Sequence, residues 1–157
     1  ELLLRWVERY PVLSIEDPFA EDDRAAWIAF ARAAPPRLQI VGDDYLATSA
    51  ARVEAAARDR ACNAALIKVN QAGTLTEAHA ALVAAGRAGF GAIVSARSGE
   101  TEDVSIAHLA VGWNAGQIKV GAFARGERMA KWNELLRIEE AGGATLSFAG
   151  GGALRHG

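Results

Sequence analysis

The chain contains little sulfur, little lysine and no long apolar run. Cys62 is its one cysteine among 157 residues, so an internal disulfide is excluded and a reducing, cytoplasmic setting is expected. We expect this cysteine to be a small buried side chain. No apolar run approaches the roughly 18 residues that a transmembrane helix needs, and the formal net charge is -2. Neither a membrane nor nucleic acid is therefore expected as a partner.

The small number of lysines is the most informative feature of the composition. Three lysines stand against fourteen arginines, and two of them, Lys68 and Lys119, lie where short apolar runs end. Arginine stays protonated in proteins, whereas a lysine shielded from water can lose its proton and act as a base. These two lysines therefore indicate a task that arginine cannot perform.

Short runs rich in isoleucine, valine and leucine alternate with stretches of helical periodicity. The runs lack the alternation of a half-exposed strand, as expected for parallel strands covered on both faces. We predict strands at residues 12–15, 38–41, 65–69, 92–94 and 117–120. This repetition predicts an α/β fold of about five βα units, in which residues 1–157 form a single domain and residues 142–157 a glycine-rich tail.

Helix signals lie between the predicted strands. The chain opens on Glu1, within a helical pattern, which we interpret as a piece cut from a longer protein. The expected helix starts are Asp22 or Asp23, Thr48 or Ser49, and Thr74, which Glu77 follows as in a capping box. Pro35-Pro36 and Gly142-Gly143 are expected to end helices.

Charged side chains close several of the predicted strands. Glu16 and Asp43 close the first two, Lys68 the third and Lys119 the last, and a polar loop at residues 95–103 follows the fourth. In a βα barrel, consecutive strand ends converge on one face. Oxygen ligands from separate strands suit a hard cation such as Mg2+, so the order predicts a metal-assisted proton-transfer site.

Single acidic residues at strand ends are more often helix caps or surface turns, and Asp17 and Asp44 fit that supporting role. A single lysine in an apolar strand is a snorkelling side chain or an ion-pair partner about as often as it is a functional group. The functional interpretation therefore depends on the whole set of residues in this order.

Six collinear stretches resemble the enolase family, the phosphopyruvate hydratases of glycolysis. They are Ser14-Ile15-Glu16-Asp17-Pro18-Phe19, Val41-Gly42-Asp43-Asp44, Lys68-Val69-Asn70-Gln71-Ala72-Gly73-Thr74-Leu75-Thr76-Glu77, Arg97-Ser98-Gly99-Glu100-Thr101-Glu102-Asp103, Gly116-Gln117-Ile118-Lys119 and Asn133-Glu134-Leu135-Leu136-Arg137-Ile138-Glu139-Glu140. The resemblance implies part of the C-terminal TIM barrel of a cytoplasmic, Mg2+-dependent lyase that converts 2-phosphoglycerate to phosphoenolpyruvate. It also implies that the parent protein is a homodimer.

The resemblance assigns roles to six residues. Glu16 and Asp43 would be metal ligands, and Lys68 the base. Lys119 would contact the carboxylate of a small phosphorylated substrate, and the segment Arg97-Ser98 would hold its phosphate.

Two departures from the family pattern leave alternatives open. Ala96 stands where the family has a loop histidine. The third metal carboxylate and the glutamates that act as the acid in the family do not occur in this sequence, so we expect no net dehydration by the isolated chain. The alternatives are a diverged relative that forms another phosphoenolpyruvate-like product, and a non-catalytic domain that keeps only the fold.

Overall fold

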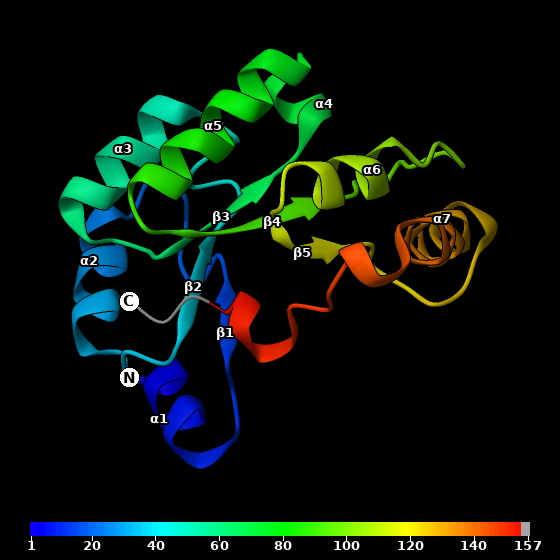
Figure 1. The fold of residues 1–157 in the computed structure, drawn as a ribbon. Helices are drawn as coiled ribbons and strands as arrows, with labels where there is room; N and C mark the ends of the chain where they lie inside the picture. Colours follow the sequence, from blue (N-terminus) through cyan, green and yellow to red (C-terminus); the bar gives the residue numbers. More distant parts are fainter. Residues whose placement is uncertain (155–157) are drawn as a thin grey trace. The chain divides into compact units, whose positions relative to one another are not determined.

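The computed structural model describes residues 1–154, in which helices and strands alternate (Figure 1). The strands are β1 Ser14–Glu16, β2 Gln39–Gly42, β3 Ala64–Ile67, β4 Gly91–Ser95 and β5 Gly116–Lys119. The helices are α1 Leu2–Arg9, α2 Arg24–Ala33, α3 Ala50–Asp59, α4 Val69–Ala72, α5 Leu75–Arg87, α6 Ser105–Gly112 and α7 Gly126–Gly142, with 3-10 turns η1 Gly143–Thr145 and η2 Gly150–Ala153.

The strands form one sheet in the order β1-β2-β3-β4-β5. The β1–β2 and β2–β3 pairs are parallel, with Glu16 opposite Val41 and Gly42 opposite Ala65. Sequential strand order with intervening helices is the arrangement of a TIM barrel, which has eight such strands. The predicted α/β fold, a partial barrel of about five βα units, is confirmed.

The chain divides into two compact units, one of Glu1–Ala92 with Leu154 and one of Ile93–Ala153. Large side chains such as Trp27, Phe30 and Leu66 fill the interior of the first unit. The second unit buries mainly small side chains, and Lys131 lies fully inside it. Each unit therefore has an interior of its own.

Side-chain caps begin the helices where the sequence predicted. The side chains of Asp23, Ser49 and Thr74 each accept a hydrogen bond from a backbone N–H in the first turn of α2, α3 and α5, at 3.0, 3.4 and 3.1 Å. These bonds satisfy N–H groups that have no partner within the helix. Helix α2 ends at Ala33, before the two prolines, and α7 ends at Gly142.

The third strand is shorter than predicted. β3 ends at Ile67 and Val69 begins α4, so Lys68 lies in the connection between strand and helix instead of inside a strand. The Lys68 carbonyl accepts the N–H groups of Gln71 and Ala72, at 3.0 and 3.2 Å. These local bonds form a helical turn, so the apolar run does not continue as strand.

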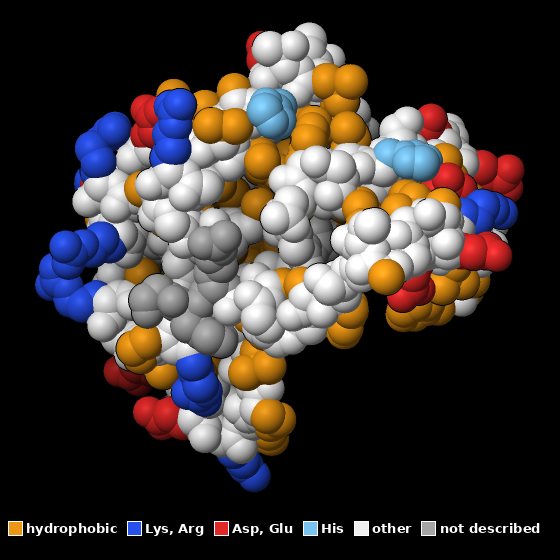
Figure 2. Space-filling model, viewed as in Figure 1, with side chains coloured by type: hydrophobic (Ala, Val, Ile, Leu, Met, Phe, Trp, Pro, Cys, Tyr) orange, Lys and Arg blue, Asp and Glu red, His pale blue; other side chains and the backbone are white. Residues whose placement is uncertain are grey.

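The part of the predicted tail that the structure describes contains η1 and η2, and residues 155–157 lie outside the described residues. Figure 2 shows hydrophobic side chains at the surface over α7. The most exposed large ones in this unit are Phe148, Phe123 and Leu136. Among residues 1–154, no helix combines the length and apolar character needed to cross a membrane.

Candidate metal and proton-transfer site

Three of the predicted site residues lie at the carboxyl ends of neighbouring strands in the first unit. Glu16 is the last residue of β1, Asp43 directly follows β2, and Lys68 directly follows β3. The parallel register aligns these three strand ends along one edge of the sheet. Strand polarity therefore places a carboxylate, a second carboxylate and an amine in order along that edge.

Asp43 and Lys68 are in direct contact. Lys68 Nζ donates to Asp43 Oδ2 at 2.5 Å, and the two side chains are only 12% and 10% exposed. The other carboxylate oxygen, Asp43 Oδ1, is buried and has no hydrogen-bond partner. An ionised oxygen in that position is unfavourable unless a donor or a cation satisfies it, so Oδ1 is suited to bind a metal ion.

Asp43 also belongs to an acidic group with Asp17 and Asp44, in which one oxygen from each lies within 4.8 Å of the others. Asp17 accepts the backbone N–H groups of Asp43 and Asp44, at 2.8 and 2.9 Å, with Oδ1 and Oδ2 respectively. Its own backbone has a φ of 40°, which non-glycine residues adopt infrequently. Asp17 thus holds the Asp43 loop in place, and Glu16 is not a member of this group.

Thr48 supports the site, although the sequence indicated only a possible helix cap at this position. Ser49 provides that cap, whereas the buried Thr48 hydroxyl accepts the backbone N–H of Lys68 at 3.0 Å and donates to Gln71 Oε1 at 2.7 Å. The contact spans 20 residues of sequence. A local capping signal cannot distinguish this role, because the partner is distant along the chain.

The remaining predicted site residues lie in the second unit. Arg97 and Ser98 follow β4, and Lys119 is the last residue of β5. The backbone N–H of Ala96 donates to the Lys119 carbonyl at 2.9 Å, so β5 pairs with the start of the Arg97-Ser98 loop. The Arg97 N–H donates to the Glu100 carboxylate at 2.7 Å.

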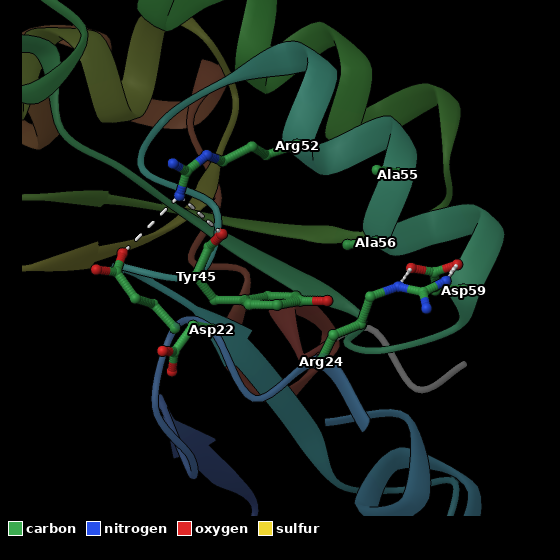
Figure 3. A pocket seen from close by; sticks show the side chains of 8 residues that line it. Asp22, Arg24, Tyr45, Arg52, Ala55, Ala56 and Asp59 are labelled. Carbon is green, nitrogen blue, oxygen red and sulfur yellow. Dashed lines mark hydrogen bonds and ion pairs between the residues drawn. The ribbon is translucent and has the colours of Figure 1, made fainter. Parts of the chain in front are cut away.

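A separate surface pocket of about 470 Å3 lies in the first unit (Figure 3). Its charged side chains are largely paired: Arg24 holds Asp59 at 2.5 Å, and this hydrogen bond lowers the pKa of the Asp59 carboxyl. Burial raises the pKa of Tyr45, which stacks on Trp27 with ring centroids 4.2 Å apart. None of the predicted site residues lines this pocket.

The lone thiol has the buried position that the sequence predicted. Cys62 is 5% exposed, and burial raises its pKa to about 12. Because the thiolate is the reactive form of cysteine, this side chain has a packing role.

A comparison with known protein families covers almost the whole chain. The family model described as Enolase, C-terminal TIM barrel domain, matches residues 1–156. The chain belongs to this family. Enolase-family membership supports a lyase-type fold, and it makes the carboxyl ends of the barrel strands the edge at which chemistry is expected.

Proposed function

We propose that this enolase-family chain carries metal-binding and proton-abstracting groups of a Mg2+-dependent lyase that dehydrates 2-phosphoglycerate to phosphoenolpyruvate. The observation that supports this most directly is the carboxylate of Asp43. One of its oxygens holds the amine of Lys68, and the other is buried with no partner. Metal-assisted proton abstraction requires a metal-binding carboxylate close to an amine that can take a proton in its neutral form. Asp43 and Lys68 supply these two groups.

The residues present fit a magnesium ion. Asp43 Oδ1 needs a cation or donor, and one oxygen each of Asp17, Asp43 and Asp44 lie within 4.8 Å of one another. Glu16 is proposed as a further ligand from the neighbouring strand end. Hard oxygen ligands of this kind suit Mg2+. When bound, the ion would stabilise the negative charge that develops on the substrate carboxylate as the α-proton leaves.

Lys68 is proposed as the base that takes the α-proton. The Thr48 hydroxyl holds the Lys68 backbone, and Asp43 orients its amine. The α-proton of a carboxylate is weakly acidic, because its removal adds charge to an existing anion. Lys119 is proposed to offset that charge as a second cation, and Arg97 and Ser98 are proposed to bind the phosphate through charge-assisted hydrogen bonds.

Metal binding is the first test of the proposal. Titration with Mn2+, followed by the electron paramagnetic resonance signal of the free ion, should detect a site that Mg2+ competes for. Asp43→Asn should weaken binding at least 10-fold, whereas Asp22→Asn, an exposed acid elsewhere in the first unit, should not change it. Equal loss in both variants, or no binding by the unaltered chain, would contradict the assignment.

The second test follows exchange of the C2 proton of 2-phosphoglycerate with deuterium oxide by proton NMR in excess Mg2+. Exchange needs the base but not the acid of the dehydration. Lys68→Arg keeps the charge and removes the basicity, so exchange should fall by about 100-fold or more. Arg137→Lys, at a 65% exposed side chain in the second unit, is the control and should exchange normally. Persistent exchange in Lys68→Arg would mean that another group is the base.

One observation favours a diverged relative as a second candidate. The Ala96 side chain is buried after β4, at the position where the family motif has histidine. A methyl group neither donates a hydrogen bond nor carries charge, so the reacting part of the substrate would differ. Proton exchange with another phosphorylated carboxylate, but not with 2-phosphoglycerate, would favour this candidate.

A further inference from the structure

The third lysine of the chain, Lys131, lies in α7 and has no exposed surface. Its ammonium has three oxygen neighbours, two as hydrogen-bond acceptors and one as an ion-pair partner. They are the Thr101 carbonyl at 2.7 Å, the Glu127 carbonyl at 2.9 Å and the Glu100 carboxylate at 3.0 Å. A buried charge is tolerated when it is paired and hydrogen-bonded. Lys131 therefore ties α7 to the loop that follows β4.

Glu100 transmits this contact to Arg97. Its Oε2 faces Lys131, while its Oε1 accepts the backbone N–H of Arg97 at 2.7 Å. The Glu100 side chain is largely buried, and both of its oxygens are engaged. The fixed ammonium thus orients a carboxylate that holds the backbone at the proposed phosphate-binding arginine.

Arg128 makes a second contact from the same helix. Its Nη1 donates to the Val120 carbonyl at 2.8 Å, and its Nη2 donates to the Ser98 carbonyl at 3.2 Å. Val120 directly follows Lys119 in the chain. A single buried guanidinium therefore joins the backbone beside two proposed substrate-binding residues. Because residues three apart share one face of a helix, Arg128 and Lys131 act on the loop together.

Residues 97–104 form neither helix nor strand, so no regular backbone ladder fixes this part of the loop. We propose that Lys131 and Arg128 are positioning residues, which fix the loop so that Arg97 and Ser98 present their side chains to a phosphate group of the substrate. This inference rests on the proposed function, because the phosphate is part of that substrate. Both positioning residues act through the backbone of the loop and not through contact with the phosphate.

The variant Lys131→Met tests the inference, with Arg137→Met as the matched control. Both remove a cation from α7 that pairs with a glutamate, but Arg137 is exposed and pairs with Glu134 outside the loop. Hydrogen exchange at the Arg97 amide should become at least 10-fold faster in Lys131→Met and stay unchanged in the control. Urea unfolding of each variant identifies conditions in which the protein remains folded.

Ligand binding distinguishes a positioning role from a purely structural one, because a structural defect would weaken the binding of all ligands alike. Isothermal titration compares 2-phosphoglycerate with glycerate, which has the same carboxylate and lacks the phosphate. Lys131→Met should lose about 10-fold in affinity for 2-phosphoglycerate and keep its affinity for glycerate. Equal losses for both ligands, or no loss for either, would overturn the positioning role.

A second variant covers the case in which Lys131→Met does not fold. Glu100→Gln keeps an oxygen for the Arg97 amide and removes the charge opposite Lys131. It should change amide exchange and phosphate-dependent affinity in the same direction, by about 3-fold. Unchanged exchange at the Arg97 amide in this variant would overturn the inference.

The two hypotheses fail in different ways. If the unaltered chain binds 2-phosphoglycerate no more tightly than glycerate, the proposed function is wrong. Amide exchange at Arg97 then still decides whether Lys131 fixes the loop, because that measurement needs no ligand.

Discussion

Breaking the Asp43–Lys68 pair should measurably destabilise the first unit. Removing one partner of a buried ion pair leaves the other charge buried and uncompensated, at a typical cost of about 3–5 kcal/mol. The two side chains keep 10–12% of their surface exposed, so water offers some compensation and the lower end of that range applies. We therefore expect Lys68→Met to reduce the free energy of unfolding by about 3 kcal/mol, which corresponds to a Tm lower by roughly 6–12 °C for a protein of this size.

The double variant Asp43→Asn/Lys68→Met separates the pair interaction from the effect of each side chain. Once both charges are gone, no charge remains buried without a partner. The double variant should therefore be more stable than the sum of the single losses predicts, by about 1–3 kcal/mol. Urea unfolding followed by tryptophan fluorescence, with a chelator present to remove divalent metal, measures all four proteins.

Additive losses in this cycle would refute the argument. Additivity within about 0.5 kcal/mol is what independent sites show, and it would mean that the 2.5 Å contact contributes no interaction energy. Arg24→Met with Asp59→Asn is the matched control cycle, because that pair is also in direct contact but its arginine is 64% exposed. Exposed ion pairs contribute little to stability because water screens them, so the coupling in this cycle should be smaller.

Three further predictions concern packing, ionisation and association. A Cβ added at Gly42 would lie 2.5 Å from Leu46 Cγ. Gly42→Ala should therefore lower the free energy of unfolding in urea by about 1–3 kcal/mol. An unchanged unfolding midpoint would contradict this prediction. The folded pKa of Cys62 is raised to about 12, above an unfolded value of about 8.5. The native state therefore holds this proton more tightly. Below about pH 8.5 the free energy of unfolding should not depend on this group, and above about pH 8.5 it should fall by about 1.4 kcal/mol per pH unit. The variant Cys62→Ala should not show this fall. Strands β1 and β5 end the sheet, and unpaired strand edges promote pairing with other chains. Light scattering at micromolar concentration should therefore show dimers or larger species. A stable monomer would count against this prediction.

The regular elements were largely predictable, because their signals are local. Side-chain caps at Asp23, Ser49 and Thr74 and the stops at the prolines act within a few residues. The end of β3 was not predictable, since the apolar run continues through Val69 while the backbone turns into α4 at Lys68. Thr48, which accepts the Lys68 N–H from 20 residues away, provides a contact that no periodicity records.

The sequence alone determined the alternation of strand and helix, the family resemblance and the order of charged residues at the strand ends, because these depend on residue type and spacing. Only the tertiary structure decided which atoms meet. It placed Lys68 on one oxygen of Asp43 and left the other buried without a partner. It also placed the third lysine, Lys131, fully inside the second unit against the loop after β4. The spacing of residues along the chain does not specify contacts between distant side chains, because those depend on how the helices pack against the strands and loops.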